Sequence, residues 1–180
     1  MLYIMRHGRT DWNNARRLQG RTDIPLNAQG LQMAERAREE YAGVHFDVCF
    51  CSPLTRAVQT AQILLRGREV PIITDERLVE MSFGACEGSC VDDPENPIRA
   101  LFSSPESYVP VEGGESLDEL FARTGQFLSE RVNPLLAQGR DVLIVGHGAM
   151  NSSIVCRVKG LPLRSFWSAG IENCKLMRLD

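Results

Sequence analysis

Two short apolar runs, far apart in the chain, each end in a histidine that is flanked by glycine. Residues 2–5 lead into Arg6-His7-Gly8, and residues 142–145 lead into Gly146-His147-Gly148. Short runs that are apolar throughout are typical of strands buried on both faces of a parallel sheet. In an open α/β sheet, ligands bind beyond the carboxyl ends of the strands. The sequence therefore predicts that His7 and His147 meet at one edge of a sheet.

The order of the other elements indicates the fold class. Strand-like runs at 47–51, 70–74 and 174–179 alternate with helical patterns at 27–43, 53–66, 116–134 and 149–159. Ser116 and Glu119 form a capping-box pattern at the start of the longest helix, which Pro134 is expected to bend or end. Strands that alternate with helices predict a three-layer α/β sandwich, in which helices flank a mainly parallel central sheet.

The length of 180 residues is typical of one domain, so we expect a single domain over 1–180. Residues 10–25 are polar and have no clean period, which indicates a long functional loop with a helical turn near Trp12. The stretch 82–114 contains Pro94, Pro97, Pro105 and Pro110 and is also irregular. We expect 82–114 to cap the site as a lid of loops and a short helix.

Charge and hydropathy narrow the range of partners and locations. The net charge of −3 argues against nucleic acid and against an anionic membrane surface as partners. No apolar run approaches the roughly 20 residues of a membrane helix. The first residues do not resemble a signal peptide, so the expected location is the cytoplasm. The sequence does not indicate an oligomeric state.

The cysteines and histidines do not form a metal-binding pattern. None of the six cysteines pairs with another at the spacing of a zinc knuckle, and no His-Glu-x-x-His motif occurs. Cys49 and Cys51 are expected to face the same side of a strand as small, reduced, apolar residues. We therefore expect neither a metal site nor a cofactor.

The residues near the strand ends suit phosphate chemistry. A phosphate monoester is a dianion, and the planar fork of a guanidinium is well matched to its oxygens. Arg6 precedes His7, and Arg56 lies at the start of the helix that follows the second strand. The start of that helix is expected to add N–H groups and a positive dipole end for an anion. The sequence thus predicts a phosphate-binding site.

Motifs spread over nearly the whole chain strengthen this interpretation. In order, they are Arg6-His7-Gly8-Arg9-Thr10-x-x-Asn13, Gln19-Gly20-Arg21-x-Asp23-x-Pro25-Leu26, Ser52-Pro53-Leu54-x-Arg56-Ala57-x-Gln59-Thr60-Ala61, Glu80-x-x-Phe83-Gly84-x-x-Glu87-Gly88, Gly114-Glu115-Ser116 and Gly146-His147-Gly148. This series resembles the histidine phosphatase superfamily, also called the phosphoglycerate mutase-like family. Cys86 departs from the pattern, because many members have tryptophan at this point.

The resemblance implies a role for each matching residue. His7 would be the nucleophile that becomes phosphohistidine, and Glu80 would donate a proton to the leaving oxygen. Arg6, Arg56 and His147 would hold the phosphoryl oxygens. Further substrate contacts would come from Asn13, Gln19, Gly20 and Gly148. Glu87 lies close to Glu80 in the sequence and is expected to serve the lid.

The resemblance implies a phosphomonoesterase that acts on a small phosphorylated metabolite. A cofactor-dependent phosphoglycerate mutase is the nearest alternative, although mutase members have extra segments for which 180 residues leave little room. A non-catalytic module that binds a phosphorylated ligand is a second alternative. Such a module would be expected to lack His7, Arg56 or Glu80, and all are present.

Overall fold

Five strands form one sheet in the order β3-β2-β4-β1-β5. The computed structural model describes residues 1–179, so Asp180, the last residue of the predicted domain, lies outside the described part. The strands are β1 (Leu2–Arg6), β2 (Val48–Cys51), β3 (Ile72–Thr74), β4 (Val142–Gly146) and β5 (Leu176–Arg178). The pairs among β1 to β4 are parallel, whereas β5 pairs with β1 in the antiparallel direction. The prediction of a mainly parallel sheet is confirmed.

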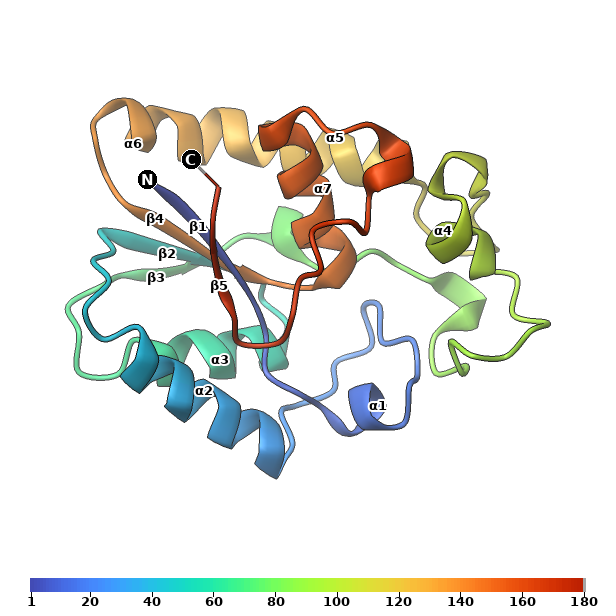
Figure 1. Cartoon of the computed structure of the whole chain (residues 1–180), viewed down its shortest axis with the longest axis horizontal. Helices are drawn as coiled ribbons and strands as arrows, with labels where there is room; N and C mark the ends of the chain where they lie inside the picture. The colour runs from blue at the N-terminus through green and yellow to red at the C-terminus, as the bar shows by residue number, and fades with distance from the viewer. Residues whose placement is uncertain (180) are drawn as a thin grey trace.

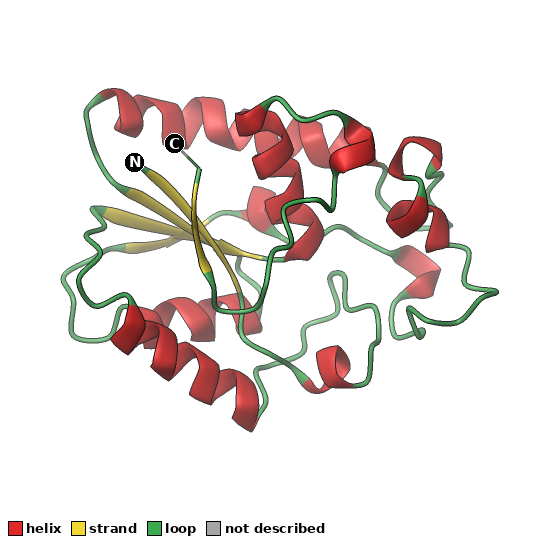
Figure 2. Ribbon diagram, in the orientation of Figure 1, coloured by secondary structure: helices red, strands yellow, loops and turns green. Residues whose placement is uncertain are grey.

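Helices cover both faces of the sheet (Figure 1). One face carries α2 (Ala28–Glu40) and α3 (Thr55–Leu64), and the other carries α5 (Leu117–Phe127), α6 (Asn133–Ala137) and α7 (Gly148–Lys159). The short helices α1 (Asp11–Asn14) and α4 (Arg99–Ser103) lie in the long connections on the right of Figure 2. The predicted three-layer sandwich and the helical turn near Trp12 are both confirmed.

The strand residues alternate between two hydrophobic cores. In β2, Val48 and Phe50 pack beneath α5 and α7, while Cys49 and Cys51 pack against α2 and α3. This alternation confirms that the two cysteines share one face. Burial raises the pKa of the Cys51 thiol to about 12, which suits an inert core residue. Cys90 is a free cysteine on the surface.

Several predicted boundaries differ from the observed ones. The helix α2 ends at Glu40, before Gly43, and α3 begins at Thr55, two residues after Pro53. The strand β3 begins at Ile72 and not at Val70. Its pairing with β2 starts at Ile72, which lies opposite Cys49. The segment 82–114 contains α4 and the 3-10 turns Gly84–Cys86 and Pro105–Ser107, as its irregular composition indicated.

Pro134 does not end the helical segment that begins with α5. The segment passes through one π-helical stretch, Leu128–Val132, and continues as α6. Proline lacks an N–H and its ring clashes with the carbonyl four residues earlier in a regular helix. Just before the proline, the Asn133 N–H bonds to the Leu128 carbonyl, five residues back. The wider π turn thus lets the chain run on through Pro134.

No helix within residues 1–179 is long and apolar enough to cross a membrane.

Candidate active site

The register of the sheet brings the two histidines together. Arg6 at the end of β1 pairs with Gly146 at the end of β4, and the His7 N–H donates to the Gly146 carbonyl at 3.0 Å. The two histidines that follow are therefore neighbours, with ring centroids 5.1 Å apart. Gly146 lets α7 pack closely on the strand end, because a Cβ there would lie 1.9 Å from Met150 Cε and 2.8 Å from Asn151 Oδ1. The predicted meeting of His7 and His147 is confirmed.

His7 is buried and held in one tautomer. Its Nδ1 lies 2.6 Å from the Gly8 carbonyl oxygen, which can only accept, so Nδ1 carries the proton. The other ring nitrogen, Nε2, makes no hydrogen bond within the described residues and keeps its lone pair. Burial, followed by the charges of Arg56 and Arg6, holds the pKa of His7 well below its ordinary value of 6.5. The imidazole is therefore neutral at neutral pH, with an unprotonated Nε2.

His147 is oriented by a buried serine. Its Nε2 lies 2.7 Å from the Ser52 hydroxyl oxygen, which also accepts the Leu54 N–H at 3.3 Å. The Ser52 proton has no other acceptor among residues 1–179, so it donates to Nε2 and places the His147 proton on Nδ1. That Nδ1–H group is buried without a partner. Burial is also the largest cause that holds the pKa of His147 well below 6.5.

Replacing Ser52 with alanine is expected to remove the preference of His147 for the Nδ1–H tautomer. Without the hydroxyl donor, the His147 ring in Ser52→Ala should populate both neutral tautomers, which long-range ¹H–¹⁵N correlation spectra of the imidazole distinguish. Ser153→Ala is the matched control, because Ser153 is equally buried and bonds to Thr124 and Met150 but not to a histidine. An unchanged Nδ1–H form in Ser52→Ala would show that another group sets the tautomer.

Arg56, which is buried, and Arg6, which is half-buried, place positive charge beside the histidines. Arg56 donates to the carbonyl oxygens of Gly20 (2.7 Å) and Thr22 (2.9 Å), and Arg6 donates to the Ile171 carbonyl (3.4 Å). The Nε atoms of both arginines are buried without a partner. Burial lowers the pKa of Arg56 to about 10, so its guanidinium remains charged at neutral pH. Buried cations with unused donors favour an anionic ligand.

The first N–H group of α3 is already occupied, although the sequence predicts that the start of this helix offers its N–H groups to an anion. The Asp23 carboxylate accepts hydrogen bonds from the Thr55 N–H at 2.8 Å and from the Thr55 hydroxyl at 2.7 Å. An internal carboxylate thus already caps this helix end. The contribution of α3 to the anion site is the Arg56 side chain.

The loop after β1 supplies polar groups to the same cavity. Asn13 Oδ1 accepts the Thr10 N–H (3.1 Å), and Gln19 Oε1 accepts the Thr10 hydroxyl (2.7 Å). These bonds leave the amide N–H₂ groups of Asn13 and Gln19 as the donors toward a ligand, since both residues line the cavity. The Gly20 backbone has φ of +54°, and a Cβ there would lie 2.1 Å from Glu87 Oε1. Glycine is thus required at this position.

Glu87 holds this loop in place. Its carboxylate accepts hydrogen bonds from the backbone N–H groups of Arg21 (3.0 Å) and Thr22 (2.9 Å) and from the Phe83 N–H (3.2 Å). Glu87 therefore joins the loop after β1 to the segment 82–114. Its oxygens are used in these contacts, which agrees with the prediction that it serves the lid segment.

Glu80 lies at the start of α7. Its carboxylate accepts the N–H groups of Ala149 (3.1 Å) and Met150 (2.9 Å) and of its neighbour Met81 (2.8 Å). A Cβ on Gly148 would lie 3.6 Å from both Glu80 Oε2 and Arg6 Cζ. Glycine at 148 thus leaves open the space between these two groups. The sequence did not reveal that Glu80 would occupy the N–H groups of this helix.

The segment before Glu80 is fixed by an ion pair that the sequence did not predict. Arg123 in α5 bonds to Glu115 through Nε (2.6 Å) and Nη2 (2.9 Å). Its Nη1 donates to the carbonyls of Arg77 (2.6 Å) and Val79 (2.8 Å). These contacts explain the Gly114-Glu115-Ser116 motif as a support for Glu80. In the sequence, only the Gly114-Glu115-Ser116 motif marks this ion pair, because Arg123 lies within an ordinary helical pattern.

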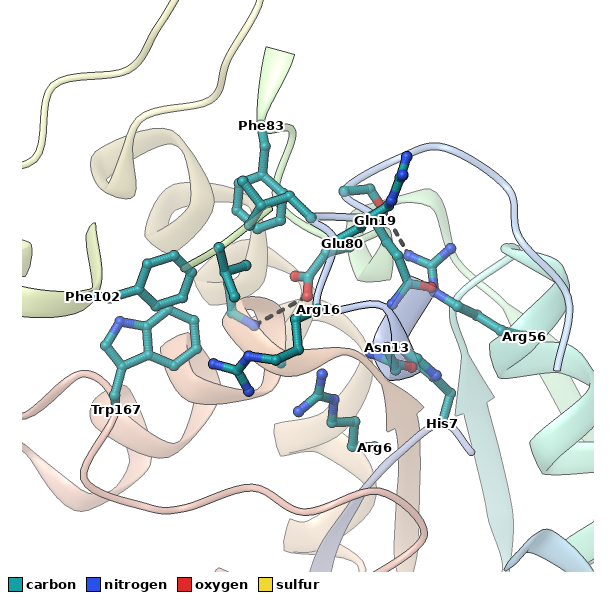
Figure 3. A pocket seen from close by; sticks show the side chains of 16 residues that line it. Arg6, His7, Asn13, Arg16, Gln19, Arg56, Glu80, Phe83, Phe102 and Trp167 are labelled. Carbon is teal, nitrogen blue, oxygen red and sulfur yellow. Dashed lines mark hydrogen bonds between the residues drawn. The ribbon is translucent and has the colours of Figure 1, made fainter. Parts of the chain in front are cut away.

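These groups surround one cavity of about 320 Å³. Figure 3 shows His7 and Arg56 on one side, Glu80 between the two sides, and Phe83, Phe102 and Trp167 on the other side. All the predicted site residues except His147 line the cavity, and the His147 ring lies beside the His7 ring. The residues that line it are Arg6, His7, Asn13, Arg16, Arg17, Leu18, Gln19, Gly20, Arg56, Glu80, Phe83, Val91, Phe102, Gly148, Ala149 and Trp167.

A group of possible metal ligands lies elsewhere in the described part of the chain. His45, Asp47 and Asp141 bring their ligand atoms within 4.8 Å of one another. Asp47 already accepts the Asp141 N–H at 2.6 Å, and Asp141 pairs with the N-terminal ammonium at 2.8 Å. Both aspartates precede a strand, so they lie at the opposite end of the sheet from the cavity.

Comparison with known proteins agrees with this geometry. Residues 2–180 match the family model of the histidine phosphatase superfamily (branch 1). The chain is 33% identical to the "Probable phosphoglycerate mutase GpmB" of Enterobacter sp. (strain 638) over 183 residues, which cover 99% of this chain and 84% of that protein. The chain therefore belongs to the histidine phosphatase superfamily.

Solved structures show the same fold. Bacillus stearothermophilus YhfR is 35% identical, with a TM-score of 0.83 over 93% of this chain and 83% of that chain. The mycobacterial glucosyl-3-phosphoglycerate phosphatase Rv2419c, solved in complex with VO3, is 26% identical, with a TM-score of 0.82 over 97% and 90%.

Proposed function

We propose that this protein is a phosphomonoesterase that hydrolyses a small phosphorylated metabolite through a phosphohistidine at His7. The observation that carries the proposal is the neutral His7 ring, anchored through Nδ1 and flanked by Arg6 and Arg56, whose Nε atoms are buried without a partner. A nucleophile beside fixed positive charge is the arrangement that phosphoryl transfer requires, because the reaction depends on positioning and electrostatics.

The proposed first step transfers the phosphoryl group to the enzyme. Arg6, Arg56 and the His147 Nδ1–H group bind the phosphoryl oxygens, and Asn13, Gln19, Gly20 and Gly148 shape the rest of the binding surface. His7 Nε2 then bonds to phosphorus while the bond from phosphorus to the ester oxygen breaks. The leaving oxygen takes a proton from Glu80, whose carboxyl group the start of α7 holds at the cavity.

The second step restores the enzyme. A water molecule attacks phosphorus and gives a proton to Glu80, and the bond between phosphorus and His7 Nε2 breaks. The products are inorganic phosphate and the free enzyme. Segment 82–114 serves as the lid over this chemistry, since Phe83, Val91 and Phe102 line the cavity.

A panel of phosphate monoesters tests the proposal. We expect release of inorganic phosphate from at least one class among sugar phosphates, phosphoglycerates and nucleotides. The enzyme should also carry a phosphate that is labile in acid and stable in base. The mutase alternative is supported by the name of the GpmB relative, and isomerisation of phosphoglycerate without net hydrolysis would favour it. Retained binding without turnover on the whole panel would favour a non-catalytic module.

Hydrolysis is expected to continue after exhaustive chelation. The guanidinium groups of Arg6 and Arg56 supply the positive charge that a metal ion supplies in other phosphatases. Phosphate release should be equal before and after treatment with a chelator and gel filtration. Activity that disappears and returns only with added magnesium or zinc would refute this prediction.

A further inference from the structure

The wall of the cavity that faces away from His7 and Arg56 is apolar. Phe83, Val91 and Phe102 come from the segment 82–114, and Trp167 comes from the connection after α7 (Figure 3). The phosphoryl group is expected at the arginine side, so this wall is where the alcohol portion of an ester would lie. The wall therefore decides which leaving groups are accepted.

Two aromatic rings form the outer part of this wall. Phe102 and Trp167 are stacked, with centroids 5.2 Å apart and an interplanar angle of 23°. The Trp167 indole N–H donates to the Leu101 carbonyl at 2.7 Å, and Phe166 packs edge-on against the indole at 4.8 Å. The Leu101 carbonyl and the Phe166 ring therefore hold the indole in place without a ligand.

Phe102 remains open to solvent at this position. It is 41% exposed although it lies at the cavity. An exposed aromatic ring beside a cavity is a favourable surface for an apolar group, because water is released when the two surfaces meet. A flat ring gains further stabilisation from offset or edge-to-face contact with another ring.

One arginine of the cavity lining is held in an ion pair. Arg16 also lines the cavity, but its guanidinium forms a two-point ion pair with Asp92, with Nη2 2.7 Å from Oδ1. A carboxylate on the leaving group would have to compete with Asp92 for this arginine. The four side chains that form the wall carry no charge, so the wall itself favours an apolar group over a carboxylate.

We propose that the wall formed by Phe83, Val91, Phe102 and Trp167 is a leaving-group site that selects phosphate monoesters whose alcohol carries an aromatic ring. This inference rests on the proposed phosphatase function for the orientation of the ester. Binding of phosphonates tests it without any turnover, because a phosphonate keeps the charged head and cannot be hydrolysed.

Isothermal titration calorimetry with three phosphonates compares the possible tails. We expect 3-phenylpropylphosphonate to bind at least about tenfold more tightly than propylphosphonate, since a buried ring adds that much affinity. We expect 2-carboxyethylphosphonate to bind no better than propylphosphonate. Equal affinity for the phenyl and propyl compounds, or preference for the carboxylate, would overturn the proposal.

Two variants test whether Phe102 causes the preference for the phenyl compound. Phe102→Ala should reduce the preference for the phenyl compound to a few-fold, because it weakens binding of the phenyl compound more than binding of propylphosphonate. Val109→Ala is the control, because Val109 is 76% exposed in the same segment and does not line the cavity. A loss of equal size for both ligands in Phe102→Ala would contradict a leaving-group role.

Hydrolysis of the matching esters separates this inference from the proposed function. The leaving alcohols of 3-phenylpropyl phosphate and propyl phosphate have similar acidity, so a difference in kcat/KM reports on the ring. Selective phosphonate binding without hydrolysis of either ester would refute the phosphatase function and support the site. Hydrolysis of both esters at equal rates would refute the site and support the phosphatase function.

Discussion

Replacing His7 with alanine is expected to abolish hydrolysis of phosphate monoesters while the protein still folds. A methyl group cannot attack phosphorus, so kcat/KM should fall by on the order of 10⁴-fold or more. The fold should persist because His7 sits beyond the end of β1, and its side-chain hydrogen bond is to the adjacent Gly8. Phosphate release and phosphate trapped on the protein should both be lost, with a normal far-ultraviolet circular dichroism spectrum.

His45→Ala provides the matched control for this prediction. His45 is exposed, and within residues 1–179 its ring bonds only to Asp47, so its removal should leave hydrolysis unchanged. Activity near the wild-type level in His7→Ala would rule out His7 as the nucleophile.

The variant His7→Ala should also change how the stability of the protein depends on pH. The pKa of His7 and of His147 lies well below 6.5 in the folded protein, and an unfolded histidine titrates near 6.5. As the pH falls below about 6.5, the unfolded chain therefore binds protons that the folded chain does not, and the free energy of unfolding decreases. His7→Ala removes one of these two contributions, so chemical denaturation should show a smaller loss of stability between pH 7 and pH 5.

Replacing Glu80 with glutamine is expected to impair hydrolysis according to the leaving group. Alkyl phosphates need a proton on the departing oxygen, so kcat should fall by about 10²–10⁴-fold. The leaving group of p-nitrophenyl phosphate departs as a stable phenolate, so its hydrolysis should be much less affected. Steady-state rates on both esters measure the difference. Equal losses on both would instead give Glu80 a binding or structural role.

Glu87→Gln is the matched control for Glu80→Gln. Glu87 accepts hydrogen bonds from Arg21, Thr22 and Phe83 and holds the loop that carries Gly20. Its loss should lower the rates on alkyl and p-nitrophenyl esters to a similar extent, because it moves the site as a whole. A loss restricted to alkyl esters in Glu87→Gln would move the acid role to Glu87.

The parts of the fold that local forces decide were predictable from the sequence. The capping box of Ser116 and Glu119 forms as expected, because its partners are three residues apart on one helix turn. The alternation of Cys49 and Cys51 follows from the pleat of a strand. The meeting of His7 and His147 was predictable because both follow buried parallel strands, and the carboxyl ends of such strands share one edge of the sheet.

Contacts between distant segments were decided only by the tertiary structure. Asp23 caps α3 across a loop, Ser52 bonds to His147, and Arg123 reaches the carbonyls before Glu80. No period or spacing in the sequence marks such pairs, because each depends on the strand register and on the path of a long loop.

The stacking of Phe102 on Trp167 was also decided only by the tertiary structure. One ring comes from a segment without clear periodicity and the other from the turn after α7. Local hydrogen bonding and hydrophobic periodicity act within a few residues and are visible in the sequence. The packing that sets the pKa of His7, the tautomer of His147 and the shape of the leaving-group wall arises only when the whole chain is folded.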